Sequence, residues 1–364
     1  MPDMNTTFSP FEEKIIASLD AGFAGIWVRT QEISEVLVSI ERIARVDGHL
    51  LATWNPINGF VMVQPSTPTG AKAAPDTIDP RVALAQLCGK DMEPPDAGNT
   101  VSRSVLVMQN FQTLLQPSQE SRCAPMVLQA LQNALLYDRA ARRHVIIVSY
   151  EGFRVPHEIE ALVRVIDHDL PTAEELHTIA TELVKGYNDD VEREQGDEGQ
   201  LLPAVPPLDT DDGKAIINAA LGLTRGGAES AFSLSLQQHQ QLDIRELWQM
   251  KVEMLRKTSG LEVHQSDAGF STIGGLEAVK KFMLNSIHGG QAGSIVQPKG
   301  VLLLGPSGVG KSQLAKAVGN ETKRPTISLN IGALMGSLVG QTEERTRIAL
   351  RQVDAIGPCV LFVD

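Results

Sequence analysis

A glycine-rich segment near the carboxyl terminus carries the side chains best suited to chemistry. Residues 305–312 read Gly-Pro-Ser-Gly-Val-Gly-Lys-Ser and match the G-x-x-x-x-G-K-[ST] phosphate-binding loop at every required position. Glycines let bare backbone approach a phosphate, so the N–H groups of such a loop can form an anion nest at the start of the following helix. Lys311 would add a positive charge for the outer phosphates of a nucleotide, and the Ser312 hydroxyl would bind Mg²⁺. The residues expected at the nucleotide are Pro306, Ser307, Gly308, Val309, Gly310, Lys311, Ser312 and Gln313.

This loop needs a strand before it, a helix after it and a carboxylate beside it. Residues 301–304 are all apolar and predict a buried strand, and residues 312–320 predict the helix. Residues 359–364 predict a second apolar strand, which ends in Asp364. A phosphate-loop enzyme needs a carboxylate at the end of a strand for its second contact to Mg²⁺, so Asp364 is expected to share the metal with Ser312.

The composition is that of a globular protein with an acidic surface. Its 364 residues are 42% hydrophobic and 21% charged, with a net charge of −12 and a pI near 5.2. This balance argues against general binding to nucleic acid or to a membrane surface, since both reward clustered lysine and arginine. The amino terminus lacks the regions of a signal peptide, and no run approaches the roughly 18 apolar residues of a membrane-spanning helix. We therefore expect a cytoplasmic protein.

Other residues that could act in catalysis or bind a metal do not form a pattern. The cysteines have no C-x-x-C spacing, so they predict neither a disulfide framework nor a zinc site; they are Cys88, Cys123 and Cys359. His157 lacks the second histidine of a zinc-protease helix. Ser149 lies outside any G-x-S-x-G context. The phosphate loop is therefore the strongest candidate site.

Strands alternate with helices along most of the chain, which predicts an α/β fold with parallel sheets covered by helices. We interpret residues 1–186 as a first α/β domain, residues 187–258 as an acidic loop plus a helical, lid-like region, and residues 259–364 as the amino-terminal part of a second α/β domain. Within these parts, residues 187–213 read as a solvated acidic loop and residues 259–270 as a polar linker.

Four motifs, in this order along the chain, resemble the AAA subgroup of the AAA+ ATPases. They are Ile-Gly-Gly-Leu at 273–276, the phosphate loop at 305–312, Leu-Val-Gly-Gln-Thr-Glu at 338–343 and Pro-Cys-Val-Leu-Phe-Val-Asp at 358–364. The resemblance covers residues 271–364 and implies binding and hydrolysis of ATP with Mg²⁺. It also implies a homo-oligomeric ring, a hexamer in this family, and a protein substrate or partner.

The resemblance assigns roles to single residues. Lys311 would contact the β- and γ-phosphates of ATP. Ser312 and Asp364 would hold Mg²⁺. Ile273 and Gly274 would lie near the adenine.

The pore segment and the end of the sequence depart from the family pattern. In the family, the corresponding loop lines a central pore and grips a polypeptide through an aromatic residue. Residues 338–340 read Leu-Val-Gly, so protein threading and ordinary packing both stay open. The sequence ends at Asp364, whereas the family continues with a catalytic glutamate and with the fourth strand of a sheet ordered 5-1-4-3-2. We therefore expect a fragment of a longer ATPase, and we expect no ATP hydrolysis by the fragment alone.

The first half looks like a degenerate copy of the same module. Residues 24–30 occupy the place of the strand before the loop, but residues 31–32 follow it without glycine or lysine. Residues 104–108 occupy the place of the Asp-ending strand, but Gln109 follows where the family has an acid. Such a half should not hold Mg-ATP. Together with Gly-Ser-Leu-Val-Gly-Gln-Thr-Glu at 336–343, it is similar to the uncharacterised AAA proteins of cyanobacteria and plastids.

Two classes of function are compatible with these features. The first is an ATP-driven enzyme that remodels a protein or a nucleoprotein assembly and works as a ring. The second is a nucleotide-dependent scaffold or switch with little turnover, whose degenerate first half binds the partner.

Overall fold

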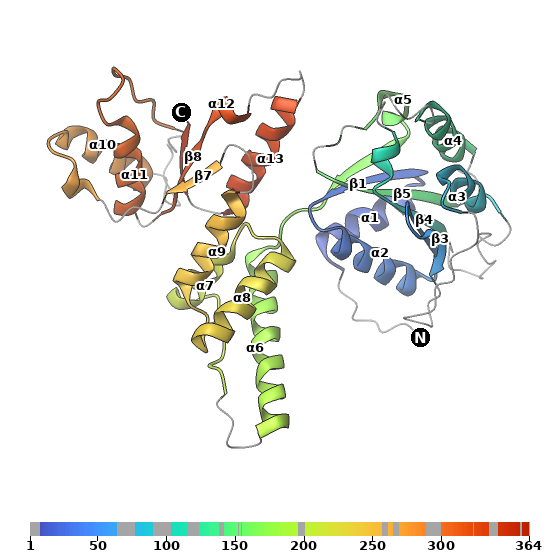
Figure 1. The fold of residues 1–364 in the computed structure, drawn as a ribbon, viewed down its shortest axis with the longest axis horizontal. Coiled ribbons are helices and arrows are strands. Elements are labelled where there is room, and N and C mark those ends of the chain that lie inside the picture. Colours follow the sequence, from blue (N-terminus) through green and yellow to red (C-terminus); the bar gives the residue numbers. More distant parts are fainter. Residues whose placement is uncertain are drawn as a thin grey trace. The chain divides into compact units, whose positions relative to one another are not determined.

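The structure, a computed structural model, contains two compact units, which span Met1–Asp169 and Leu170–Asp364 (Figure 1). It describes residues 8–63, 77–89, 103–115, 124–137, 142–151, 153, 155–195, 201–256, 261–264, 269–288, 300–322, 324–334, 341–356 and 359–363. Asp364 and the pore segment at 338–340 lie outside the described residues.

A six-stranded sheet forms the centre of the first unit, in the order β3-β2-β4-β5-β1-β6. Its strands are β1 (Gly25–Thr30), β2 (Leu50–Asn55), β3 (Gly59–Val63), β4 (Ser104–Gln109), β5 (Arg143–Tyr150) and β6 (Val163–Asp167). Five strands pair in parallel, and only β3 runs antiparallel, as a hairpin partner of β2. Numbered without β3, the strands lie in the order 5-1-4-3-2. The structure thus confirms the expected α/β fold and the sheet order of an ATPase module.

Helices cover both faces of this sheet (Figure 1). One face packs against α1 (Pro10–Asp20) and α2 (Ile33–Asp47), and the other against α3 (Pro80–Leu87) and α4 (Ala124–Tyr137). The short helix α5 (His157–Glu160) precedes β6. Successive residues of a strand point to opposite faces, so Ile26 and Val28 lie in one core while Trp27 lies in the other. This double burial explains why the strands read as continuous apolar runs.

Four helices open the second unit and share one core. They are α6 (Ala173–Gln195), α7 (Asp211–Ala220), α8 (Arg225–His239) and α9 (Ile244–Arg256). The expected loop at 187–213 is wrong in its first part, because α6 continues to Gln195. Tyr187 packs against a small apolar cluster, and the Asn188 amide both donates to the Leu202 carbonyl and accepts from the Leu202 N–H. These tertiary contacts hold an acidic segment in a helix that its composition alone does not favour.

A three-stranded sheet follows, in the order β7-β8-β9. The strands are β7 (Leu261–His264), β8 (Thr326–Leu329) and β9 (Val360–Val363), and the helices around them are α10 (Glu277–His288), α11 (Lys311–Glu321), α12 (Ile331–Leu334) and α13 (Gln341–Ile356). Strand β8 pairs with β9 in parallel and with β7 antiparallel. The same three-strand pattern occurs in the first unit as β3-β2-β4.

Strand β7 corrects the expected linker at 259–270. Leu261 and Val263 are buried in a core with Ala349, Val353 and Ile356 of α13, while Glu262 and His264 alternate with them on the opposite face. This period-two pattern is that of a half-buried strand. It extends over only four residues, which is too short to distinguish a strand from a polar linker in the sequence.

The expected strand at 301–304 is also wrong. These residues form no strand, and the exposed fractions of Val301, Leu302 and Leu304 are 39%, 83% and 86%. A strand needs a neighbour for its backbone N–H and C=O groups. In the order 5-1-4-3-2, that neighbour on the β9 side is the fourth strand, and the described residues of this unit contain no strand in that place. The apolar run therefore forms no strand with the described residues of this unit.

Candidate nucleotide-binding site

The phosphate loop turns sharply into α11 with the geometry that its glycines permit. Gly308 and Gly310 have φ angles of +82° and +88°, in the left-handed region that a side chain makes costly. Gly310 is the residue that caps the amino terminus of α11. A Cβ on Gly305 would lie 3.2 Å from the Val309 side chain. The loop thus directs its backbone toward the positive end of a helix, the arrangement that favours phosphate.

Lys311 is folded back over the loop. Its ammonium group donates hydrogen bonds to the carbonyl oxygens of Gly305, at 3.0 Å, and Pro306, at 2.8 Å. These bonds hold a positive charge beside the backbone N–H groups of the loop, where the charge of a phosphate would be stabilised.

Helix α11 is fixed to the sheet by close packing. Leu314 and Val318 are buried, and Gly319 lies so close to β8 that a Cβ would come within 1.9 Å of the Thr326 hydroxyl oxygen. This anchor keeps the start of the helix, with the exposed side chain of Ser312, near the carboxyl ends of β8 and β9. Leu329 pairs with Val363 at the carboxyl ends of β8 and β9, and Asn330 follows Leu329 at this edge.

The turn at 273–276 is held by hydrogen bonds to residues outside the phosphate loop. The buried Lys280 donates to the carbonyl oxygen of Ile273 at 2.7 Å and pairs with Glu277 at 2.9 Å. The backbone N–H of Phe270 donates to Glu321, at the far end of α11 from the loop. Among the described residues, no hydrogen bond joins Ile273 or Gly274 to the loop, so their role at the adenine stays a prediction.

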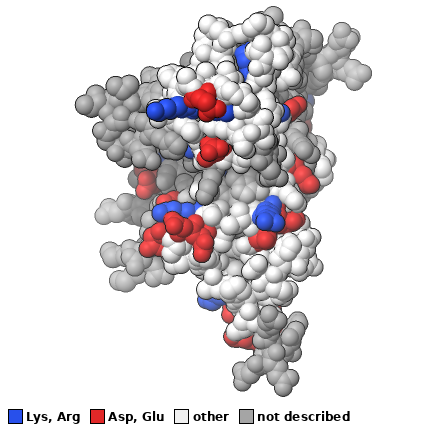
Figure 2. Space-filling model, turned by 90° about the vertical axis from the view of Figure 1, so that its left-hand side faces the viewer, with Lys and Arg blue, Asp and Glu red and all other residues white. Residues whose placement is uncertain are grey.

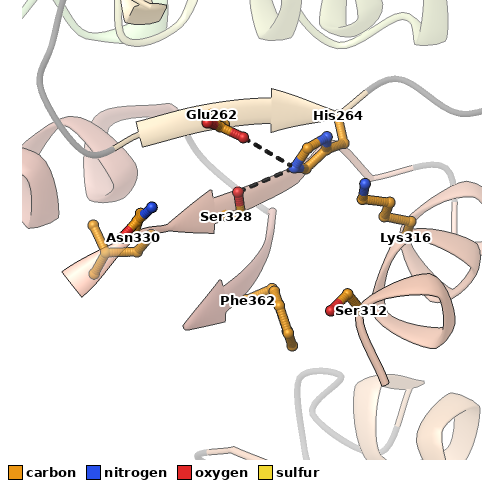
Figure 3. A pocket seen from close by; sticks show the side chains of 8 residues that line it. Glu262, His264, Ser312, Lys316, Ser328, Asn330 and Phe362 are labelled. Carbon is orange, nitrogen blue, oxygen red and sulfur yellow. Dashed lines mark hydrogen bonds and ion pairs between the residues drawn. The ribbon is translucent and has the colours of Figure 1, made fainter. Parts of the chain in front are cut away.

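A pocket of about 350 Å³ adjoins the start of α11 (Figure 3). It is lined by Glu262, His264, Ser312, Lys316, Ser328, Leu329, Asn330 and Phe362. His264 Nε2 lies 3.0 Å from the Ser328 hydroxyl and 3.9 Å from Glu262. Burial and the charge of Lys316 lower the pKa of His264, while Glu262 opposes that shift. The sequence patterns predicted no role for this group; its local signal is the alternation of polar and apolar residues along β7.

In the first unit, side chains of the unit itself interact with one another at the end of β1, the place that corresponds to the phosphate loop. Only two residues separate β1 from α2. The Thr30 hydroxyl lies 3.0 Å from His168 Nδ1, and Gln31 donates to Glu151 at 3.2 Å. Arg29 forms a two-bond ion pair with Asp167, at 2.7 and 3.0 Å.

Strand β4 of the first unit ends in an amide, at Gln109. In the sequence, this residue stands where the family pattern has an acid. The residue after Met108 is Gln109, which cannot supply the anionic oxygen that Mg²⁺ prefers.

Comparison with known proteins agrees with this geometry. Residues 301–364 match the model of the ATPase family associated with various cellular activities (AAA). The chain belongs to the AAA ATPases. Residues 11–168 match the N-terminal domain of SpoVK-like AAA ATPases, and residues 174–258 match the second domain. These matches confirm that the family motifs and the altered first half belong to one AAA architecture; the domain boundaries expected from the sequence stay a prediction.

Curated relatives match this chain over very different shares of its length. The "Uncharacterized AAA domain-containing protein ycf46" of Trieres chinensis is 24% identical over 363 residues, which are 97% of this chain and 65% of that protein. The ycf46 protein of Gracilaria tenuistipitata var. liui is 27% identical over 65% of this chain and 46% of its own. The "Cell division cycle protein 48 homolog" of Archaeoglobus fulgidus is 37% identical over 25% of this chain and 14% of its own. The chain thus spans 65% and 46% of the length of these two ycf46 proteins.

Family membership supports nucleotide binding and ATPase activity in general. No helix among the described residues is long and apolar enough to cross a membrane.

Proposed function

We propose that the loop at 305–312 binds Mg-ATP and that, in the whole protein, hydrolysis of this ATP drives remodelling of a protein or nucleoprotein partner. The observation that carries the proposal is the loop itself. Gly308 and Gly310 adopt the left-handed conformation at the start of α11, and Lys311 is held within the loop. This donor set suits a triphosphate with its metal ion.

The residues of the site divide into those that bind the phosphates, the metal ion and the adenine. The backbone of residues 306–310, with Gln313, surrounds the phosphates, and Lys311 offsets the charge on the β- and γ-phosphates. Ser312 and Asp364 hold Mg²⁺, which supplies Lewis-acid stabilisation of that charge when it is bound. Ile273 and Gly274 lie near the adenine. The protein works as a homo-oligomeric ring, as is typical of the family, with six subunits proposed here.

The surface charge favours protein over nucleic acid as the partner. On the face drawn in Figure 2, lysine and arginine side chains occur in small groups beside aspartate and glutamate. Together with the net charge of −12, this mixture on the described residues gives little attraction for a phosphodiester backbone.

Lys311→Ala is expected to weaken nucleotide binding at least about 30-fold. The variant removes a charge-assisted contact to phosphate, worth roughly 2–3 kcal/mol. Titration of the purified chain with a fluorescent ADP analogue in the presence of Mg²⁺ measures the affinity. Lys281→Ala is the matched control, because Lys281 is an exposed lysine of α10. Equal affinity in the Lys311 variant and its parent would refute the proposed site.

We further propose that this chain alone binds nucleotide with little turnover. Among the described residues, the segment at 301–304 belongs to no strand, and the contact of Gly319 with Thr326 links the helix after the loop to the sheet. A malachite-green assay of phosphate release tests this point. Turnover by the isolated chain that is lost in Lys311→Ala would contradict it.

A scaffold or switch is the second candidate function. The first unit favours this second function. Its Arg29, Thr30 and Gln31 side chains interact with other side chains of the same unit, so they are not available to bind a nucleotide. In this case nucleotide would order the second unit while the first unit binds the partner. Phosphate release by the whole protein distinguishes the two functions, since only the remodelling enzyme requires sustained turnover.

A further inference from the structure

The two faces of the small sheet in the second unit differ in chemistry. The face toward α13 is apolar and includes Leu261, Val263, Ile327 and Leu329. Thr326 lies on the face toward α11, since Gly319 of that helix packs against it. His264 pairs with Thr326 in the register of β7 and β8, so this face carries polar side chains. Polar side chains turned toward a packed helix lose part of their hydration, which costs free energy unless partners replace the water.

The polar face and the first two turns of α11 enclose the pocket of about 350 Å³. Figure 3 shows the ammonium group of Lys316 directed toward His264, with Ser328 on β8, Asn330 just after this strand and Ser312 at the opposite side of the space. This arrangement offers a cation, hydroxyl groups and an amide from separate elements to one small volume. A liquid water occupies about 30 Å³, so the pocket has room for a tetrahedral oxyanion and several waters.

The charges within this group leave Lys316 as the available cation. In the described part of the chain, Lys316 forms no hydrogen bond or ion pair. The carboxylate of Glu262 lies 3.9 Å from His264, and its side chain is 67% exposed. Its partner in the pocket is therefore His264 and not Lys316. His264 is already engaged with Ser328 at 3.0 Å, which positions both groups.

We propose that this pocket is a second oxyanion site, beside the phosphate loop and bordered by its Ser312, which takes inorganic phosphate through Lys316, Ser328 and His264. Its position next to Ser312 lets phosphate arrive from a nucleotide at the loop or from solution. The arrival from a nucleotide rests on the proposed function, whereas the binding of free phosphate does not.

The test is a ³¹P NMR titration of inorganic phosphate with the purified chain, in the presence of saturating ADP so that the loop is occupied. The phosphate line is expected to broaden in a saturable way. Lys316→Met should weaken this binding at least about tenfold, because it removes a charged donor. Lys316→Arg should retain it, and Lys281→Met on α10 should leave it unchanged. The ADP affinity of Lys316→Met should stay within about twofold of the parent, which also shows that the variant is folded.

The outcomes separate this proposal from the proposed function. If ADP does not bind, the proposed function fails, and the titration is repeated on Lys311→Ala without ADP. Phosphate binding that survives Lys311→Ala but is lost in Lys316→Met supports the second site. Phosphate binding that is unchanged in Lys316→Met, or that is absent from the parent chain, overturns it. Stronger phosphate binding with ADP present than without it shows that the pocket is coupled to the nucleotide site, as the arrival of phosphate from a nucleotide would require, and equal binding shows that the pocket takes free phosphate independently of the nucleotide.

Discussion

Gly319→Ala is expected to lower the free energy of unfolding of the second unit by about 3 kcal/mol. A Cβ at this position would lie 1.9 Å from the Thr326 hydroxyl oxygen and 2.9 Å from the Arg324 carbonyl oxygen. The second contact is with backbone, so rotation of a side chain cannot relieve both. Helix α11 would have to move away from β8, and the loop at its amino terminus would move with it. Chemical denaturation, with hydrogen exchange of α11 and β8 as a local readout, measures the loss.

Two variants test the steric explanation. Gly186→Ala is the matched control, because Gly186 lies within α6 and has no atom within 4 Å of an added Cβ. That variant should be stabilised by up to about 1 kcal/mol, since alanine favours a helix. Adding Thr326→Ala to Gly319→Ala should recover part of the loss by removing the nearer contact. If Gly319→Ala changes the free energy of unfolding no more than Gly186→Ala does, α11 and β8 do not approach each other as closely as described here.

A second large effect is expected from Lys251, which is fully buried in α9. Burial lowers its pKa from 10.5 to about 7, with a small opposing influence of Cys359. Its ammonium group donates to the Asn218 carbonyl oxygen at 3.0 Å and lies 4.4 Å from the centre of the Trp248 ring. One hydrogen bond and one aromatic ring replace only part of the lost hydration.

The sign of the pH dependence follows from this shift. Above pH 7 the folded chain loses the lysine proton while the unfolded chain keeps it up to its ordinary pKa of 10.5. The unfolded state then binds more protons, so the free energy of unfolding rises with pH. Between pH 7 and pH 9 the gain should be about 2–3 kcal/mol, at about 1.4 kcal/mol for each pKa unit. Cys359 opposes this gain toward pH 9, because burial raises the pKa of its thiol in the folded chain, so the unfolded chain releases that proton first.

Lys251→Met should abolish this gain and be more stable than the parent at pH 6. The methionine fills similar space without a charge, although the carbonyl of Asn218 loses its donor. Urea denaturation at pH 6, 7, 8 and 9 gives the slopes for parent and variant. Lys281→Met, at an exposed site, should keep the parental slope. Parallel pH profiles for the parent and Lys251→Met would show that this lysine does not titrate in the folded state as expected.

Local features allowed the sequence by itself to determine the character of the site. The phosphate loop is one contiguous segment, and the positive φ angles of Gly308 and Gly310 follow from their lack of a Cβ. The loss of these site residues from the first half could likewise be predicted from local sequence. The residues that replace glycine, lysine and aspartate there, including Gln109, stand at the ends of strands that apolar runs make visible. Fold class, sheet order and family could therefore be predicted.

Only the tertiary structure decided the features that depend on distant partners. Asn188 holds the end of α6 through Leu202, and β7 becomes a strand because β8 pairs with it. Residues 301–304 have strand composition and still form no strand, since backbone hydrogen bonds need a neighbour that composition does not specify. The meeting of His264 and Lys316 in one pocket likewise depends on the packing of Gly319 against β8, a contact between residues that no local pattern relates.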